Sequence, residues 1–394
     1  MSKGLHDRIA IVGMGCTNFG ELWDSSSDDL AVDAVEAAIA SVPGLNKSDI
    51  EAYWYSTLAT GHSGLPLAKA LKVERPVSRV ENYCASGSDA FRNAAFAVAA
   101  GVYDVAMAVG VEKLKDSGYS GLTVDDPPSD NTLPEISNPA SYAMLPASYS
   151  EHYGVDPAEL RQALTHVAWK NHSNGALNPR AQYKSVVSKE TIDAAPRVAG
   201  DLSVFDCSGV ADGGAAAIIV RAEDAYKYTD MPMFLKGMSL HAGSSSGAST
   251  AGQRHVTFPE VTACAKAAYA EAGVTDPRTQ ISMAEVHDCF TPTEMILLED
   301  LGFSERGQGW KDLIAGRYDL DGDLPVNPDG GLKSFGHPVG ASGLRMMFEL
   351  WLQFRGEAGA RQLDNPTLGL THNMGGLPGE FVSFIALFGA ELDR

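Results

Sequence analysis

The sequence of 394 residues contains few cysteines, and no two of them lie close together. Its five cysteines are Cys16, Cys84, Cys207, Cys264 and Cys289, an odd number with no C-x-x-C pair. Closely paired cysteines are typical of zinc sites and redox-active disulfides, and an even set is typical of a secreted disulfide framework. The sequence therefore predicts no metal site and no disulfide scaffold, and it favours a reduced, cytoplasmic protein.

Long apolar runs and an excess of basic residues are also missing. No stretch approaches the roughly 20 apolar residues of a membrane span, and the apolar run in "MSKGLHDRIAIVGMGCTNFG" is too short for a secretion signal. The chain has 30 Lys and Arg against 50 Asp and Glu, a formal net charge of −20. Such a charge disfavours binding to nucleic acid or an anionic membrane surface. With 44% hydrophobic residues, the chain is expected to fold into several packed units.

Two stretches resemble known motifs but lack a required residue. "GMGCTNFG" begins like a dinucleotide-binding turn, yet Asn18 stands where the third glycine belongs. "DLDGDLPVNPDG" begins like a calcium-binding loop at Asp319, yet its sixth and twelfth positions are Leu324 and Gly330. That loop needs Gly and Glu at those positions. We interpret the first as a turn after a buried strand and the second as a solvated turn.

The predicted elements follow the same order twice. A helical pattern over residues 30–42 stops before Gly44 and leads to a strand near Ile50. A second helical pattern stops at Gly273 and leads to a strand near Ile281. Each half later contains a small-residue turn that opens into an apolar helix, "CASGSDAFRNAAFAVAAG" in the first and "GHPVGASGLRMMFELWLQFRG" in the second. The pattern predicts a duplicated α/β core.

Apolar runs at residues 104–111 and 214–220 are typical of strands covered on both faces. Between them lies a segment with the irregular stretch "DDPPSDN" and a helix that starts with Asp156 as N-cap and Pro157 as first helical residue. We interpret this segment as an insertion. The predicted units are 1–115 with 201–240 as the first half, 116–200 as the inserted domain, and 241–394 as the second half.

Cys84 is a candidate nucleophile because it lies in a Gly/Ser-rich turn just ahead of a predicted helix. The N-terminus of a helix stabilises an anion such as a thiolate. A lone cysteine is more often a packed structural thiol. The neighbouring motifs must therefore decide between the two interpretations.

The stretch "VHDCFTPTEMILLEDLGF" is one motif that bears on the interpretation of Cys84. Thr291 as N-cap and Glu294 would complete a capping box that fixes the start of a helix. His287, Asp288 and Cys289 would then lie in the loop at the carboxyl end of a strand, where α/β proteins bind ligands.

Two glycine-rich stretches complete the set of candidates. His337 in "GHPVGASG" could accept the proton of a thiol. Gly375 and Gly376 in "THNMGGLPGEF" could hold an oxyanion with their backbone N–H groups. Each motif is only moderately specific by itself.

Together, the motifs "CASG", "NHSNGALNP", "SGVADGGAAAII", "HDCF", "GHPVGASG" and "HNMGG" span essentially the whole chain. In this order they resemble the thiolase superfamily, most closely the sterol-carrier-protein-2 type of thiolase, which is acetyl-CoA acetyltransferase-like. The resemblance implies a thiolase fold with two βαβαβαββ halves, five α/β/α/β/α layers, an inserted loop domain, and a homodimer or homotetramer. It also implies reversible Claisen condensation or thiolytic cleavage of 3-ketoacyl-CoA, with coenzyme A as a substrate and no tightly bound cofactor.

The resemblance assigns roles by motif position. Cys84 resembles the nucleophile that becomes acylated, and His337 resembles the base that activates it. His337 and His287 resemble the first oxyanion hole, and the backbone N–H groups of Cys84 and Gly375 resemble the second.

One departure separates this chain from many thiolases, which carry a second catalytic cysteine in a C-x-G-G-G loop. This chain has Asn373 at about that place. In the sterol-carrier-type branch, the cysteine of "HDCF", here Cys289, takes over the proton transfer. Asn373 and Met374 are then expected to contact the substrate.

The inserted domain binds coenzyme A in the resembled family, and coenzyme A carries several phosphate charges. Bases outnumber acids between residues 161 and 197. The candidates for binding are Arg161, Lys170, Arg180 and Lys184.

Three other functions stay open. A β-ketoacyl synthase would share the fold and the nucleophile but lacks a second catalytic thiol, so Cys289 argues against it. A thiolase-like retro-aldolase would cleave acyl-CoA side chains with a small OB-fold, zinc-ribbon partner protein, and it needs no nucleophilic cysteine. A noncatalytic acyl-CoA-binding subunit would need neither Cys84 nor His337.

Overall fold

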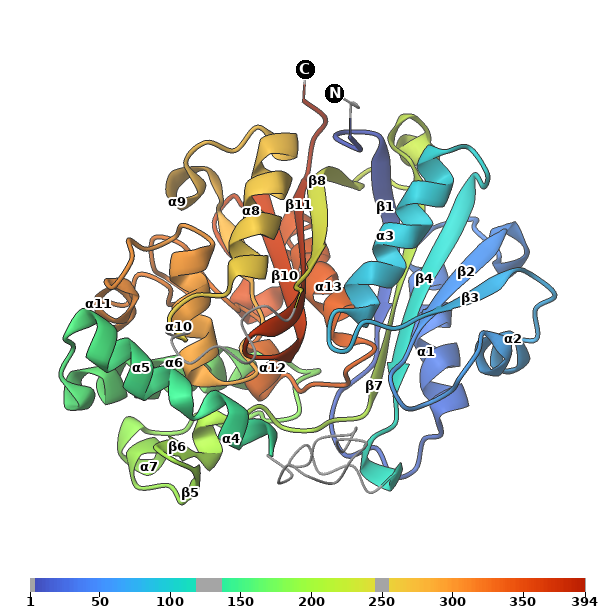
Figure 1. The fold of residues 1–394 in the computed structure, drawn as a ribbon. Helices are drawn as coiled ribbons and strands as arrows, with labels where there is room; N and C mark the ends of the chain where they lie inside the picture. The colour runs from blue at the N-terminus through green and yellow to red at the C-terminus, as the bar shows by residue number, and fades with distance from the viewer. Residues whose placement is uncertain (1–3, 118–136, 245–254, 394) are drawn as a thin grey trace.

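The structure is a computed structural model that describes residues 4–117, 137–244 and 255–393 (Figure 1). A large mixed sheet contains β1 (Ile9–Cys16), β2 (Ala52–Ser56), β3 (Val77–Val80), β4 (Val105–Glu112), β7 (Gly213–Arg221), β8 (Met233–Ala242), β9 (Met283–Glu285), β10 (Leu368–Leu377) and β11 (Glu380–Gly389). The short strands β5 (Arg197–Ala199) and β6 (Leu202–Ser203) pair separately. The predicted α/β class is confirmed.

Helices cover both faces of this sheet. The longer ones are α1 (Ser27–Ala40), α3 (Ser86–Ala99), α5 (Met144–Tyr153), α6 (Pro157–Ala176), α8 (Pro259–Ala272), α10 (Thr291–Asp300) and α13 (Ser342–Phe354). The shorter ones are α2 (Leu65–Leu71), α4 (Asn138–Tyr142), α7 (Lys189–Asp193), α9 (Pro277–Gln280), α11 (Gly309–Ile314) and α12 (Gly331–Ser334). Helix α1 packs on β1, β4 and β7, α8 packs on β8 and β11, and α3 contacts α13 between the two parts of the sheet (Figure 1). This is the expected five-layered arrangement.

The strand order confirms the duplication. The sheet runs β3-β2-β4-β7-β1-β8-β11-β10-β9, and β1 meets β8 through only two residue pairs. On one side, β1 pairs with β7 and β7 pairs with β4, both antiparallel, and β4 pairs with β2 in parallel. On the other side, β8 pairs with β11 and β11 pairs with β10, both antiparallel, and β10 pairs with β9 in parallel. The counterpart of β3 is reduced to one parallel bridge between Ala284 and Val326.

This order places the boundary between the halves before β8. Strand β8 matches β1 in its pairing, so it opens the second half. The boundary predicted at residue 240 lies near the end of β8.

The local sequence explains the elements that were predicted from it. Strands β4 and β7 are buried almost throughout, as expected for apolar runs with helices on both faces. Helix α1 buries Leu30, Ala34 and Ala38, which share one face at helical spacing. Helix α6 begins as predicted, with the Asp156 carboxylate accepting from the backbone N–H of Ala158.

The inserted segment joins the two halves. It connects β4 to β7, which are neighbours in the sheet, whereas the matching strands β10 and β11 are joined by a tight turn. Its helix α6 packs against α10, α11 and α12 of the second half (Figure 1). The insertion therefore reaches the loops of the second half that carry the candidate site. Within the described residues, no helix combines the length and apolar character of a membrane span.

Candidate active site

Cys84 lies in a tight turn between β3 and α3. The preceding residue, Tyr83, adopts a left-handed backbone with φ of +49°, a conformation that is costly for a residue with a side chain. The Ser86 hydroxyl stabilises the turn by donating to the Tyr83 carbonyl and accepting from the N–H of Asn82 at 2.8 Å. The turn leaves Cys84 half-buried at the wall of a large cavity.

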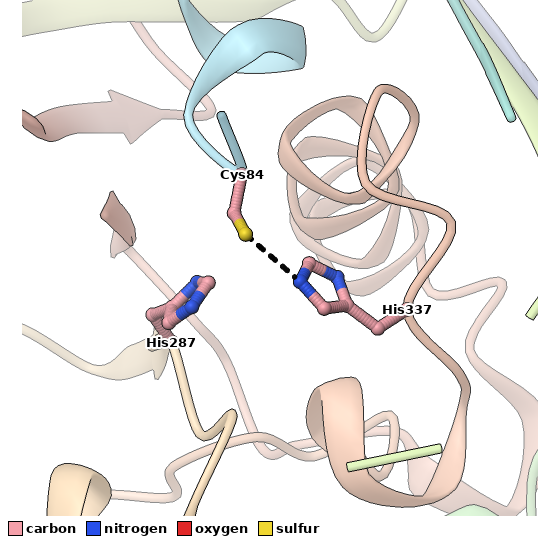
Figure 2. A group of neighbouring side chains, drawn as sticks. All are labelled: Cys84, His287 and His337. Carbon is pink, nitrogen blue, oxygen red and sulfur yellow. Dashed lines mark hydrogen bonds between the residues drawn. The ribbon is translucent and has the colours of Figure 1, made fainter. Parts of the chain in front are cut away.

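His337 is hydrogen-bonded to Cys84, with 3.2 Å between its Nε2 and the sulfur (Figure 2). Its Nδ1 lies 2.7 Å from Ser342 Oγ, and that hydroxyl donates to the Pro338 carbonyl at 3.0 Å. Because the serine proton is engaged, Ser342 must accept from an Nδ1–H, which leaves Nε2 unprotonated toward Cys84. Burial, with a smaller effect of Arg345, lowers the pKa of His337 to about 3. The ring is thus a neutral base beside the thiol.

His287 faces the same pair from the second half (Figure 2). Its ring lies 5.5 Å from that of His337, at nearly a right angle. Its Nδ1 is buried and has no hydrogen-bond partner among the described residues. Burial, and next the nearby His337, lower the pKa of His287 well below its usual range. A neutral ring in this position can donate to a ligand oxygen in the cavity.

These three side chains could also hold a metal ion, since the Cys84 sulfur and one ring nitrogen of each histidine lie within 4.8 Å of one another. Such N and S donors suit zinc. A second group, His6, Asp7 and Asp393, has the same spacing near the chain ends.

Cys289 lines the cavity close to Cys84. Its side chain is buried, and its sulfur lies 3.8 Å from Thr293 Oγ1. Burial, and next the nearby Cys84, raise the pKa of the Cys289 thiol well above its usual value. The group is therefore protonated at neutral pH and can act as a proton donor.

The helix after Cys289 does not start with the predicted capping box. Phe290 is the N-cap of α10, and no side chain caps the helix. Thr291 lies inside the helix and donates to the Asp206 carboxylate at 2.6 Å. Glu294 is engaged by the amides of Asn171 and Asn327, at 2.8 Å each, instead of the N-cap backbone. Thr291 and Glu294 therefore bond to residues that are distant in the sequence instead of capping the helix.

A buried carboxylate holds the His287–Cys289 loop in place. Asp288 accepts from the backbone N–H groups of Leu332 and Lys333, at 2.7 and 3.2 Å. The Asn171 amide, from the inserted segment, donates to it at 2.8 Å. Burial, and next Glu294, raise the pKa of Asp288 to about 7. Two helices, α12 and α6, thus fix the loop between the two candidate side chains.

A second buried cluster lies close to both histidines. The Arg345 guanidinium donates to Glu285 at 2.6 Å and also to Asp329, and all three side chains are fully buried. Its positive charge contributes to the lowered pKa of His287 and of His337. The cluster therefore favours neutral imidazoles in the site.

The cavity has a volume of about 1200 Å³ and brings together Cys84, His287, Cys289 and His337. Among the described residues, its charged lining consists of Lys115, Lys184, Lys333 and Glu380. Three cations against one anion give this described part of the lining a positive charge, although the chain as a whole is acidic.

Lys333 is the most buried of these cations. Its ammonium group donates to the Cys207 carbonyl at 2.8 Å. Burial lowers the pKa of Lys333 to about 8, so its charge is present at neutral pH and is lost as the pH rises through that value.

The glycine loop closely approaches Cys84. A Cβ atom on Gly375 would lie 2.8 Å from the Cys84 backbone nitrogen, so only glycine allows this approach. Met374 lines the cavity. Asn373 instead points toward α3, where its Oδ1 accepts from Ser88 at 2.6 Å, and it is fully buried.

The four bases predicted to bind phosphates lie in different places. Lys184 lines the cavity. Arg161 forms two hydrogen bonds to Asp206, at 2.8 and 2.9 Å, and Lys170 is buried 3.0 Å from Glu294. Arg180 donates to the Cys16 carbonyl and lies over the Phe348 ring. Arg161, Lys170 and Arg180 are not among the described residues that line the cavity, and each bonds to a residue of another segment.

Several contributors were not recognised in the sequence. Ser342 lies inside the quoted "GHPVGASG" motif, five residues after His337, and its role follows only from the two hydrogen bonds at its hydroxyl. Arg345 gave no signal, and Asp288 was placed in its loop without a role, because burial of a charge is not visible in a sequence without its partners. Tyr142, which also lines the cavity, follows an irregular stretch and carries no motif.

Comparisons with known proteins agree with this geometry. Residues 9–223 match the family profile "Thiolase, N-terminal domain", and residues 242–386 match "Thiolase C-terminal domain-like". The chain belongs to the thiolase family, and it is an acyltransferase.

Its relatives narrow the type to the sterol-carrier-protein-2-like and acetyl-CoA acetyltransferase-like members. The chain is 36% identical to "Acetyl-CoA acetyltransferase" of Methanothermobacter thermautotrophicus, over 94% of this chain and 97% of that protein. It is 29% identical to "Sterol carrier protein 2" of Bos taurus, over 94% of this chain and 70% of that protein. Among solved structures it is similar to the "Ltp2-ChsH2(DUF35) aldolase", with a TM-score of 0.83, 25% identity, and coverage of 99% of this chain and 100% of that one.

Proposed function

We propose that this protein transfers acyl groups between coenzyme A thioesters and the α-carbon of acetyl-CoA through an acyl-enzyme on Cys84. The observation that carries the proposal is the hydrogen bond of 3.2 Å between the Cys84 sulfur and the unprotonated Nε2 of His337. A thiol beside a neutral imidazole becomes a nucleophile at the moment of attack.

In the degradative direction, the Cys84 sulfur attacks the 3-keto carbon while His337 takes the thiol proton. The bond between the α- and β-carbons breaks, and its electron pair forms the enolate of acetyl-CoA. Cys289 gives its proton to that enolate, and the acyl group stays on Cys84. A second coenzyme A then accepts the acyl group, and condensation reverses these steps.

Two positions are suited to the oxyanions of this sequence. His287 presents a neutral ring whose N–H can stabilise an enolate oxygen, and His337 can donate from Nε2 once it has taken the Cys84 proton. The backbone N–H groups of Cys84 and Gly375 come from segments in van der Waals contact, which supports the second oxyanion hole.

Coenzyme A is the proposed substrate, and its phosphates would need a positive surface. Lys184 and Lys115 line the cavity and support this binding, together with the buried Lys333. We also propose a cytoplasmic homodimer or homotetramer.

An aldolase is the competing function, because the chain is similar in structure to the Ltp2-ChsH2(DUF35) aldolase. A retro-aldolase would need a DUF35 protein as partner here and would leave Cys84 without a role. The hydrogen-bonded Cys84–His337 pair favours the transferase.

A thiolysis assay separates the two functions. The purified protein is given acetoacetyl-CoA with and without free coenzyme A, and the products are separated by chromatography. The transferase forms two acetyl-CoA molecules only when coenzyme A is present. Formation of no acetyl-CoA, together with carbon–carbon cleavage of a β-hydroxyacyl-CoA, would contradict the proposal and favour the aldolase.

A further inference from the structure

Cys84, His287 and His337 have the arrangement of three protein ligands around one metal ion (Figure 2). The Cys84 sulfur and one ring nitrogen of each histidine lie within 4.8 Å of one another. In a tetrahedral zinc site, Zn–S bonds of about 2.3 Å and Zn–N bonds of about 2.0–2.1 Å place sulfur and nitrogen about 3.5 Å apart. The sulfur and His337 Nε2 lie 3.2 Å apart, close to this value. Small side-chain movements therefore suffice to enclose an ion.

The hydrogen bonds of His337 suit a metal ligand. Its Nδ1 donates to Ser342 Oγ at 2.7 Å, so the lone pair of Nε2 faces the Cys84 sulfur. Metal-binding histidines almost always donate their other ring N–H to such an acceptor, which fixes the ring. Ser342 in turn donates to the Pro338 carbonyl at 3.0 Å. The arrangement that orients a base thus also orients a zinc ligand.

His287 provides an independent observation. Its side chain is 2% exposed, yet its Nδ1 has no hydrogen-bond partner among the described residues. A buried nitrogen without a partner is costly and calls for an explanation. An ion held by this ring breaks no hydrogen bond at Nδ1, so His287 can become a ligand at little cost.

The second group with this spacing, near the chain ends, is less suited to zinc. Asp7 and Asp393 of that group already accept from the Lys236 ammonium, at 2.7 and 2.9 Å. This cation repels another positive ion. The group also lacks a thiol, a ligand that zinc binds well. The site around Cys84 is therefore the stronger candidate of the two.

We propose that Cys84, His287 and His337 bind a zinc ion that inhibits the enzyme, with the fourth position open to the cavity. On binding, the Cys84 thiol releases its proton to solvent, and a water molecule from the cavity completes the four ligands. Three protein ligands with an open fourth position are typical of zinc sites that exchange a ligand. Binding of the ion does not depend on the reaction, whereas its inhibitory effect rests on the proposed function.

Zinc binding and the proposed reaction need the same electron pairs. A sulfur bound to zinc is no longer available to attack a carbonyl, and a coordinated Nε2 of His337 can no longer take a proton. An acyl group on Cys84 converts the sulfur into a thioester, which lacks the negative charge of a thiolate ligand. The ion and the acyl group therefore exclude each other.

The three ligands come from separate segments of the chain. Cys84 precedes α3, His287 follows β9, and His337 precedes α13. No short spacing marks such a site in the sequence. The absence of a C-x-x-C pair therefore excludes only a site built from neighbouring residues.

Cobalt(II) is the probe for this site because, unlike zinc, it absorbs visible light. The metal-free protein is titrated with cobalt chloride, and its absorption spectrum is recorded. We expect a thiolate-to-cobalt charge-transfer band in the near ultraviolet that saturates at one ion per chain, is removed by zinc, and is missing in Cys84→Ala. No band in wild type at millimolar cobalt, or a full band in a folded Cys84→Ala, would overturn the proposal.

The histidine ligands are tested by the affinity for cobalt. His287→Gln and His337→Gln should each weaken binding by at least about tenfold, since loss of an outer-shell partner alone costs about 10–100-fold. Circular dichroism checks that each variant is folded. Unchanged affinity in both variants would overturn the assignment.

Matched controls come from the same cavity and from the other group. Cys207 and His172 line the cavity but do not belong to the group around Cys84. Cys207→Ser and His172→Gln should keep the band and the affinity, and His6→Gln should do the same. A loss in any of these controls as large as that in the ligand variants would contradict a site built on Cys84.

Protection of the thiol gives a readout that needs no catalysis. Zinc should slow iodoacetamide alkylation of Cys84 by at least about tenfold, because the coordinated sulfur is no longer a free nucleophile, and EDTA should restore the rate. Cys207, mapped in the same digest, is the internal reference. Equal alkylation of Cys84 with and without zinc would overturn the proposal.

Acetylation tests the inhibition itself. Zinc should suppress acetylation of Cys84 by acetyl-CoA, and EDTA should restore it, as followed by intact mass. Acetylation that zinc leaves unchanged would overturn the inhibition. Absence of acetylation without zinc would instead contradict the proposed function, and the cobalt spectrum would still report on the metal site.

Discussion

The loops that follow β2 and β9 occupy equivalent places in the two halves but have different content. The loop after β2 folds around Glu112, whose carboxylate accepts from the Thr57 hydroxyl and the Leu58 N–H at 2.8 and 2.9 Å. The loop after β9 carries His287 and Cys289, and its own carboxylate, Asp288, fixes it. The same topology therefore positions a loop that is folded around Glu112 in one half and the loop that carries His287 and Cys289 in the other.

The turns ahead of α3 and α13 show the same division of roles. The first half presents Cys84 ahead of α3, and the second presents His337 ahead of α13, where Ser342 orients it. Gly340 N–H donates to Glu112 at 3.0 Å, so the structural carboxylate of the first half supports the histidine turn of the second. The duplication supplies two similar frames, and the proposed reaction uses one side chain set from each.

The largest expected effect concerns the nucleophile. Cys84→Ala should lower thiolysis of acetoacetyl-CoA by at least about a thousandfold, because it removes the thiol that is hydrogen-bonded to His337. Cys207→Ser is the matched control, since Cys207 also lines the cavity. Burial raises the pKa of Cys207 to about 12, so its variant should still be acylated at Cys84. Steady-state assays and mass spectrometry check both, and substantial thiolysis by Cys84→Ala would assign the nucleophile to another group.

The next effect concerns stability, because the second half contains the buried charge cluster. Arg345→Met leaves Glu285 and Asp329 buried without their cation, which should cost about 3–5 kcal/mol of unfolding free energy. Arg355→Met, at a partly exposed position paired with Glu357 at 3.1 Å, should cost less than about 1 kcal/mol. Urea unfolding followed by circular dichroism gives both values. Equal losses would contradict the claim that the cluster stabilises this half.

Acid sensitivity should come from buried histidines such as His372. Burial lowers its pKa to about 3, below that of an unfolded histidine near 6.5. The unfolded chain therefore binds more protons below pH 6.5, so this contribution is complete at higher pH and is lost as the pH falls toward 3. Between pH 7.5 and 5, wild type should lose about 2 kcal/mol more than His372→Gln does.

The control for this experiment is His62→Gln, a change at an exposed position in the first half. Its unfolding free energy should follow that of wild type at both pH values. If His62→Gln lost as little unfolding free energy between pH 7.5 and 5 as His372→Gln does, the acid sensitivity would not be specific to the buried histidine.

The smallest effect concerns the positive wall of the cavity. Lys184→Ala should raise the KM for coenzyme A by about threefold with little change in kcat, because an exposed charge contributes modestly. Lys311, on the outside of α11, provides the control. An unchanged KM in Lys184→Ala would show that this lysine does not contribute to the binding of coenzyme A.

Much of this organisation could be predicted from the sequence. The repeated order of helix, strand and small-residue turn predicted the duplicated fold, since these patterns are local. The family resemblance named Cys84 and His337, and the structure brings them within 3.2 Å. The start of α10 was predicted wrongly, because Thr291 and Glu294 match a capping box locally but bond to residues far along the chain.

The remaining features depend on contacts between distant segments. Arg161 and Lys170 are among the bases predicted to bind coenzyme A, and buried carboxylates pair with them. Burial and long-range partners also decide the states of Asp288 and Lys333. Sequence patterns carry no information on which charges meet in the interior.

The most direct test of the account is the location of the acyl group. The protein is incubated with acetyl-CoA, its intact mass is measured, and the modified peptide is mapped. The account predicts one added acetyl group on Cys84, lost on addition of free coenzyme A. An acetyl group on another cysteine, or none with any acyl-CoA that the protein turns over, would contradict it.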